Sequence, residues 1–320
     1  MNDNKIKEIL FEKVYGHIPK KPIHLSIEEK DKYDFAAGAA VYQSQNMILE
    51  TENGDITLPF YSIIPIKSNK KAAIITINFE DSLPNKFLPA EEIVERGYAI
   101  FSICINDVTD NDANFKSGIY PVLVGSRRKK SAPGKIAMWT YAASLLFDHI
   151  KTIDEIDKSA IGVSGHGVCA KAALLTAAIN EDISFVIAND ALSTFSFIGK
   201  DESAEVRMAY ERPYLFCRSF ADNPIRNEHA LLYQLCRGRK ILVGCSADDV
   251  NSNYNIEYKM LLDGTTLCDA AKYSENDLNL NTVPFVFEND DLLFSLREGT
   301  SYFSRKDWNR YLDFLDKRLK

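Results

Sequence analysis

The chain has 320 residues, of which 46% are hydrophobic, and its formal net charge at pH 7 is −7. This length and composition predict one or two domains with a large buried core. The acidic balance, with a sequence pI near 5.4, argues against nucleic acid or an anionic membrane surface as a partner. No stretch reaches the roughly 20 consecutive apolar residues that span a bilayer.

The first residues favour a helix over a targeting signal. Residues 1–5 lead into apolar residues at helical spacing, which predicts a helix over residues 4–15. Because no apolar h-region is present, we expect no signal peptide and a cytoplasmic location. The sequence does not define an oligomeric state.

The six cysteines are scattered without CxxC spacing, and several lie within apolar strands. This pattern is typical of buried free thiols in a reducing compartment. No His/Asp/Glu cluster has the spacing of metal ligands, so we expect neither a metal nor a cofactor. The cysteines are Cys104, Cys169, Cys217, Cys236, Cys245 and Cys268.

Strands then alternate with helices along most of the chain. Asn53-Gly54 between two apolar runs, 47–51 and 56–66, predicts an antiparallel hairpin near the start. We expect residues 1–320 to form a single domain in which residues 1–45 are an N-terminal helical segment. Further strands are expected at 72–77, 98–105, 160–164, 183–187, 240–245 and 292–297, and helices at 89–97, 135–150, 168–178 and 305–319.

This alternation predicts an α/β fold with a mostly parallel central sheet, antiparallel N-terminal strands and helices on both faces. Sites in such sheets lie at the carboxyl ends of the strands. The basic run at 127–130 is expected in a solvated loop, and the polar stretch 273–282 in a surface loop. The loops expected to carry a site are 78–84, 106–133, 189–196, 246–253 and 299–303.

The most informative segment is residues 161–174, an apolar strand, a glycine-rich turn and an alanine-rich helix. This is the layout of a nucleophile elbow, whose usual pattern is G-x-S-x-G. In the natural register, the residue at the tip of the turn is Gly167. The sequence therefore predicts a turn built to present a nucleophile, without the nucleophile.

Two nearby residues are alternative nucleophiles. Ser164 stands at the end of the strand, where its hydroxyl is expected to point into the sheet. Cys169 falls in the first turn of the helix, where a helix N-terminus can lower the pKa of a thiol. The more ordinary interpretation of each is a buried residue without a chemical role, and both alternatives stay open here.

With the elbow in place, the chain from about Ile6 to Leu319 resembles the carbohydrate-esterase branch of the α/β-hydrolases. It is most similar to glucuronoyl esterases and acetylxylan-esterase-like proteins. The resemblance implies the α/β-hydrolase fold. The segments that carry it are residues 8–16, 96–99, 165–172, 228–232, 239–243, 246–249 and 307–314, together with Trp139 and Asp148.

That resemblance implies a serine nucleophile, a histidine base and an orienting carboxylate. The serine corresponds to Gly167, and the arginine after it corresponds to Val168. The loop after the last strand places Ser301 at the histidine position. The carboxylate corresponds to Asp190, or to Asp248 or the adjacent Asp249. A capping or turn role is the alternative for these aspartates.

No other histidine is expected to replace the missing base. The chain has five histidines, and none follows the last predicted strand. His166, beside the elbow, is expected to pack or to bond the backbone, and His229 matches a helix histidine of the resembled family. The remaining three are His17, His24 and His149.

The sequence therefore predicts a carbohydrate-esterase-like protein without serine catalysis, which binds a carbohydrate or acyl small molecule or acts in regulation. The alternative is an active carboxylic-ester hydrolase that uses Cys169 or Ser164. Leu215 replaces an aromatic residue of the resembled family. Candidate pocket residues are Asn78, Phe79, His166, Val168, Cys169 and Tyr214.

Overall fold

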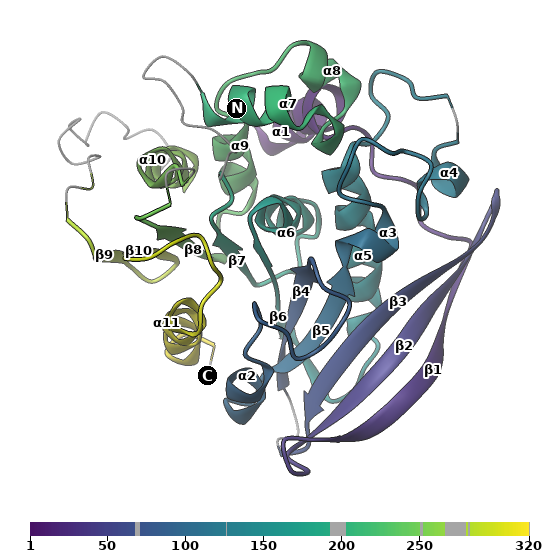
Figure 1. Cartoon of the computed structure of the whole chain (residues 1–320), viewed down its shortest axis with the longest axis vertical. Coiled ribbons are helices and arrows are strands. Elements are labelled where there is room, and N and C mark those ends of the chain that lie inside the picture. Colours follow the sequence, from purple (N-terminus) through teal and green to yellow (C-terminus); the bar gives the residue numbers. More distant parts are fainter. Residues whose placement is uncertain are drawn as a thin grey trace.

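The computed structural model describes residues 1–67, 71–125, 127–192, 203–249, 252–265, 280 and 282–319. Within these residues, ten strands form one sheet in the order β1-β2-β3-β5-β4-β6-β7-β8-β10-β9 (Figure 1). No helix of this part of the chain is long and apolar enough to cross a membrane.

The centre of the sheet is parallel, as the alternation of strands and helices predicts. Each neighbouring pair from β5 to β10 is parallel, so the carboxyl ends of these strands meet at one edge. The strands in sheet order are β5 (Ala99–Cys104), β4 (Lys71–Asn78), β6 (Ile156–His166), β7 (Phe185–Asn189), β8 (Lys240–Ser246) and β10 (Leu292–Arg297).

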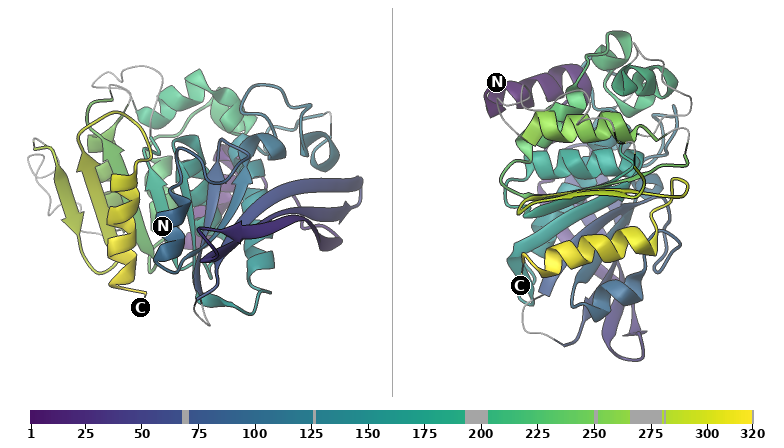
Figure 2. Two further views of the ribbon diagram at one scale, coloured as in Figure 1. Left: turned by 60° about the horizontal axis from the view of Figure 1, so that its bottom comes forward. Right: turned by 90° about the vertical axis from the view of Figure 1, so that its left-hand side faces the viewer.

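A long antiparallel ribbon extends the sheet on one side. It consists of β1 (His24–Phe35), β2 (Ala40–Thr51) and β3 (Gly54–Pro65), and Figure 2 shows it projecting from the body. The expectation that residues 1–45 are helical is correct only for the first turns. The charged stretch 28–34 hides the strand pattern of β1, because both faces of this edge strand are largely exposed.

Helices cover both faces of the sheet (Figure 2). One face packs against α1 (Asp3–Ile9), the π-helical turn η1 (Leu10–Val14), α5 (Lys135–Ile150), α6 (Val168–Ile179), α9 (Glu228–Leu235) and α10 (Tyr254–Thr265). The other face packs against α2 (Ala90–Glu95) and α11 (Arg305–Asp316). Shorter elements are α3 (Ile105–Val108), α4 (Tyr120–Leu123), α7 (Ala204–Glu211), η2 (Pro213–Leu215), α8 (Arg218–Asp222) and the antiparallel edge strand β9 (Phe285–Glu288), which the sequence did not predict.

Two loop expectations meet different outcomes. Arg128, in the basic run, is not simply solvated, because its guanidinium stacks 3.4 Å over the Phe115 ring and its Nε donates to Tyr120 Oη at 3.0 Å. Most of the polar stretch 273–282 lies outside the described residues, as does Cys268. The five described cysteines are buried free thiols, as expected.

A buried lysine anchors the long loop between β5 and α5. Lys135 begins α5 and is fully buried, and its Nζ donates to Thr109 Oγ1 and to the carbonyl of Asn114, both at 2.6 Å. Burial lowers the pKa of Lys135 from 10.5 to about 8, against the opposing effect of Asp112 and Asp110. The loop therefore depends on a cation that is poorly solvated.

This lysine makes stability depend on pH in the alkaline range. Between about pH 8 and 10.5, the unfolded chain holds the Lys135 proton more tightly than the folded one. The free energy of unfolding of the wild type, minus that of Lys135→Met, should therefore rise with pH across this window. Urea unfolding at several pH values measures it, and a difference that stays flat or falls would contradict the lowered pKa.

Candidate active site

The turn between β6 and α6 has the backbone of a nucleophile elbow. Gly167, at its tip, has φ 58° and ψ −125°, and its N–H donates to the carbonyl of Asn189 at the end of β7, at 2.8 Å. Gly165 must lack a side chain, because a Cβ there would lie 2.3 Å from the carbonyl oxygen of Cys169. The tight approach of helix to strand therefore follows from the glycine pattern.

The tip of the elbow carries no side chain but has space for one. A Cβ built on Gly167 would meet nothing nearer than Cζ of Phe79, at 4.0 Å. Its positive φ is strained for any other residue, at a cost of about 1–3 kcal/mol. Glycine at this position therefore removes strain and also leaves the turn without a nucleophilic atom.

Asp190 and Ser301 come together from distant parts of the chain. Ser301 Oγ, in the loop after β10, donates to Asp190 Oδ2 at 3.0 Å. The same carboxylate accepts from Ser246 N–H and Ser246 Oγ, each at 3.1 Å, and from Ser252 Oγ at 3.2 Å. Asp190 is therefore a buried carboxylate surrounded by serine donors rather than by an imidazole.

Burial raises the pKa of Asp190 above its ordinary value, and the nearby His166 and the serine hydrogen bonds partly offset this rise. Asp190 also has a positive φ of 49°, a conformation that an aspartate adopts only with some strain. Asp248, the alternative position for the acid, is exposed and accepts instead from the N–H of Gly299 at 2.7 Å. Of these two aspartates, Asp190 contacts Ser301.

His166 is held by its neighbours in sequence and space. Its Nδ1 donates to Asn189 Oδ1 at 2.8 Å, since Asn189 Nδ2 donates to Tyr311 Oη at 3.0 Å. The His166 ring stacks on Phe87 and on Phe303, with centroids 5.8 and 6.1 Å away. The expected packing is present, but the hydrogen bond goes to a side chain rather than to the backbone.

Neither alternative nucleophile is accessible. Ser164 is fully buried, and its Oγ donates within the sheet to the carbonyl of Ile75 at 3.4 Å. Cys169 is also fully buried, and burial raises the pKa of its thiol well above the ordinary value. Among the described residues, no histidine bonds to either one. Nucleophilic attack from these atoms would require the core to open.

Three of the six candidate pocket residues are buried. Val168 and Cys169 lie in the core, and Asn78 Nδ2 donates to Ser102 Oγ at 2.8 Å. Phe79 and Tyr214 are partly buried and pack against the core. These residues support the site rather than line a cavity among those described below.

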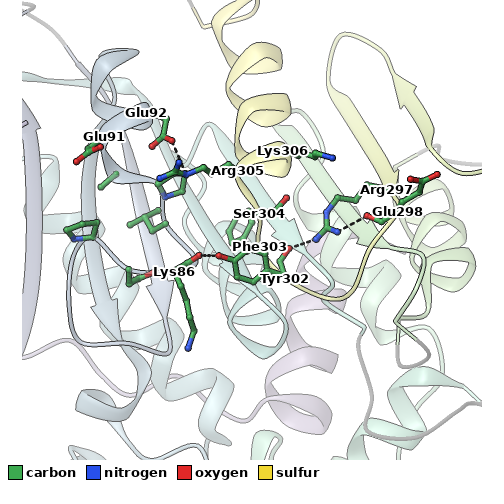
Figure 3. Close-up of a pocket in the computed structure, with 15 residues that line it drawn as sticks. Lys86, Glu91, Glu92, Arg297, Glu298, Tyr302, Phe303, Ser304, Arg305 and Lys306 are labelled. Atoms are coloured by element: carbon green, nitrogen blue, oxygen red, sulfur yellow. Dashed lines mark hydrogen bonds and ion pairs between the residues drawn. The ribbon is translucent and has the colours of Figure 1, made fainter.

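A cavity of about 880 Å³ lies beside the loop that carries Ser301 (Figure 3). Its floor is apolar and includes Leu88 and Phe303, and its rim is charged. Sequence reasoning missed this cavity because its two walls, 84–92 and 297–306, meet only in the folded chain. Its lining residues are Pro84, Asn85, Lys86, Leu88, Pro89, Ala90, Glu91, Glu92, Arg297, Glu298, Tyr302, Phe303, Ser304, Arg305 and Lys306.

The two walls of this cavity are joined by polar contacts (Figure 3). Arg305 Nε lies 3.0 Å from Glu92 Oε1, and Tyr302 Oη donates to the carbonyl of Lys86. Behind them, Trp308 Nε1 donates to the carbonyl of Phe87 at 2.9 Å. The wall 84–92 is therefore fixed against the start of α11.

A buried charge network supports the site from the helical face. Lys171 Nζ donates to Glu228 Oε1 and to His229 Nδ1, the latter at 3.1 Å. Because an ammonium only donates, His229 Nδ1 must accept, so its Nε2–H donates to Glu257 Oε1 at 2.7 Å. Glu257 Oε2 in turn accepts from the N–H of Leu192, two residues after Asp190, at 3.0 Å. His229 is thus a structural residue that helps to hold the Asp190 loop.

No group of three or more His, Cys, Asp or Glu side chains in the described part of the chain could hold a metal ion. The groups gathered at the elbow are hydroxyls, one carboxylate, one imidazole and aromatic rings. Such a set can bind a ligand through hydrogen bonds and ring contacts.

Comparison with known proteins rests on structure, since no family model and no curated protein sequence matches this chain. A glucuronoyl esterase from Solibacter usitatus superposes with a TM-score of 0.83 at 18% identity, over 98% of this chain and 91% of that one. A CE15 glucuronoyl esterase from Teredinibacter turnerae T7901 also gives 0.83, at 17% identity, over 100% and 84% of the two chains. A glucuronoyl esterase variant from Sporotrichum thermophile, solved with methyl 4-O-methyl-β-D-glucopyranuronate, gives 0.66 at 16% identity, over 98% and 80%.

The strand order, the elbow and these similarities define the class of the fold. The chain has an α/β-hydrolase fold of the kind found in carbohydrate esterases. The solved structures that it resembles include CE15 glucuronoyl esterases. The fold predicted from the elbow and the sequence segments is confirmed.

The backbone strain at the elbow can be measured as a change in the free energy of unfolding. Gly167→Ala should lower the free energy of unfolding by about 1–3 kcal/mol, because the added methyl has space but the positive φ is unfavourable. Gly238→Ala is a matched control, with φ 81° and no atom within 4 Å of the added Cβ, and should cost a similar amount. Urea unfolding measures both, and an unchanged Gly167→Ala protein would contradict the elbow geometry.

The contribution of the contact between Ser301 and Asp190 to the free energy of unfolding can be measured by substitution. Ser301→Ala should lower the free energy of unfolding by about 1.5–3 kcal/mol, because it removes a hydrogen bond to a buried carboxylate. The exposed Ser26, changed to alanine, should cost less than about 0.5 kcal/mol. Equal effects of the two substitutions in urea unfolding would show that Ser301 does not hold Asp190.

Proposed function

We propose that this protein is a non-catalytic relative of the carbohydrate esterases, which binds a carbohydrate or acyl ligand and does not hydrolyse it. The observation that carries the proposal is the identity of the two residues at the reacting positions. The elbow tip is Gly167, and the group that faces Asp190 is the hydroxyl of Ser301. A serine hydroxyl is a poor base at neutral pH, and a glycine has no atom that attacks a carbonyl.

The expected loss of rate is large. Removing the serine or the histidine of a catalytic triad costs about 10⁶ in kcat, nearly as much as removing the whole unit. Val168 stands where the resemblance implies an arginine, so a further contact to the developing oxyanion is missing. Three positions that differ together support natural divergence of the whole site over a single substitution.

The burial of Cys169 and Ser164 argues against the alternative, an active hydrolase with a displaced nucleophile. A thiol is reactive as its thiolate, and burial raises the pKa of Cys169. Ser164 donates its hydroxyl hydrogen within the sheet. No observation favours a second catalytic arrangement.

The ligand class rests on two supports. The similar proteins are glucuronoyl esterases, and one was solved with a methyl glucuronate. The cavity beside the Ser301 loop offers the partly exposed ring of Tyr302 together with cationic and anionic groups. Hydroxyl groups both donate and accept hydrogen bonds, so a polyhydroxylated ligand can use both kinds of rim group.

Ester hydrolysis and ligand binding test the proposal in parallel. The wild type should hydrolyse p-nitrophenyl acetate no faster than Cys169→Ala or Ser164→Ala. Methyl 4-O-methyl-β-D-glucopyranuronate or xylo-oligosaccharides should raise the melting temperature, because a ligand bound to the native state stabilises it. The rise should be smaller in Tyr302→Ala.

Wild-type turnover that either Cys169→Ala or Ser164→Ala abolishes would overturn the non-catalytic role. A melting temperature that none of the carbohydrate or acyl compounds changes would overturn the binding role. Gly167→Ser combined with Ser301→His serves as a positive control. It restores the two missing groups on a scaffold that keeps the elbow and Asp190, and its turnover should exceed that of the wild type at least tenfold.

A further inference from the structure

A second cavity lies between β1 and the end of α5, and no residue of the elbow lines it. Its volume is about 460 Å³, which is within the range of about 300–1,000 Å³ typical of ligand clefts in proteins. The residues that line it are Lys21, Pro22, Leu25, Ser26, Ile27, Leu145, Asp148, His149 and Thr152.

The two walls follow from the periods of a helix and a strand. Leu145, Asp148, His149 and Thr152 are spaced by three, four and seven residues, so they share one face of α5 and its end. Residues 25 and 27 share one face of β1. They pair with Leu49 and Met47, both fully buried, so this face of the ribbon is the inner one. The walls therefore present mainly aliphatic carbon to the cavity.

The charges at the cavity compensate one another. The charged residues that line it are Lys21 and Asp148, and Lys21 Nζ lies 2.5 Å from Asp148 Oδ2. A charged ligand would lose its hydration on entering the cavity, and no lining residue of opposite charge is free to pair with it. Such desolvation of a charge costs free energy in an apolar site. The lining therefore favours an uncharged ligand.

His149 supplies an imidazole to this lining. Its ring lies edge-on to Phe60, with centroids 5.7 Å apart. Neither ring nitrogen makes a hydrogen bond to any described residue. Burial lowers the pKa of His149, so its ring is mostly neutral at pH 7. A neutral imidazole offers one donor and one acceptor.

We propose that this cavity binds a small, uncharged, mainly apolar molecule that carries one hydroxyl group, with His149 as the polar anchor. A hydroxyl both donates and accepts, which matches the two nitrogens of a neutral imidazole. The apolar part of the ligand fits the aliphatic walls, and its burial supplies the favourable free energy of binding. This site is separate from the elbow and does not depend on the proposed function.

Three probes with the same chain and different head groups test the ligand class. These are 1-hexanol, hexanoate and hexylammonium, added to protein with ¹³C-labelled histidine. The His149→Phe variant assigns the His149 signal among the five histidines. Hexanol should shift this signal saturably, with a dissociation constant of about 1 mM, as suits so small a ligand. The two charged probes should bind at least tenfold more weakly.

Two matched tryptophan variants locate the binding. Leu25→Trp places a large ring in the cavity and should abolish the hexanol-induced shift of His149. Thr57→Trp adds the same ring to the exposed face of β3, since Thr57 is exposed between the buried Ile56 and Leu58 and lines none of the cavity, and should leave the shift unchanged. Far-UV circular dichroism and the urea midpoint confirm that each variant is folded.

The proposal is overturned if hexanol at 20 mM leaves the His149 signal of the wild type unmoved, in which case the cavity holds water only. It is also overturned if hexanoate or hexylammonium binds as tightly as hexanol, or if folded Leu25→Trp protein binds hexanol like the wild type. Should Leu25→Trp fail to fold, hexanol binding to His149→Phe, measured by thermal shift, decides the question. At least a tenfold weakening supports the anchor, and wild-type affinity refutes it.

Discussion

The candidate site depends on the close contact between β6 and the first turn of α6. Gly165 allows that contact, because any Cβ there would meet the backbone of Cys169. The chain then has to turn sharply at Gly167, whose N–H is tied to Asn189 at the end of β7. This tie fixes β7 relative to the elbow and so places Asp190, the next residue, at the same edge of the sheet. The relative positions of Gly167 and Asp190 are thus determined by backbone geometry, whatever side chains they carry.

Asp190 shows how a buried carboxylate at this edge of the sheet is held by hydrogen bonds. A buried carboxylate needs hydrogen-bond donors, or its burial is costly. Here Ser246, Ser252 and Ser301 supply them. Hydroxyl groups donate hydrogen bonds to the carboxylate as an imidazole N–H would. Unlike an imidazole, they do not accept a proton from a nucleophile at neutral pH. The carboxylate is therefore compatible with a structural role in a site that keeps its shape.

Much of this architecture could be predicted from the sequence, because it rests on local patterns. The glycines around position 167 predicted the elbow, and the alternation of strands and helices predicted the parallel sheet. The strand β1 escaped prediction because its charged residues lie on an exposed edge. Asp190 and Asp248 both follow strand ends, so local pattern could not choose between them. Only the tertiary contact of Ser301 with Asp190 distinguishes them.

The two cavities could not be predicted for the same reason. The walls of the cavity beside Ser301 are about 200 residues apart in sequence, and their contacts arise only on folding. His149, on the other cavity, reads in the sequence as one more helix residue. Its place in a cavity wall becomes visible only when β1 lies beside α5. Long-range proximity is a property of the fold, and no local pattern encodes it.

The central claim is that the elbow presents no nucleophile, and covalent labelling tests it most directly. Incubation with a fluorophosphonate, which reacts with activated serine nucleophiles, followed by intact-mass measurement, reports one adduct per active site. The wild type should gain no mass, while Gly167→Ser combined with Ser301→His should gain one adduct on the peptide that contains residue 167. A stoichiometric adduct on the wild type, at Ser164, Cys169 or any other residue, would contradict the account.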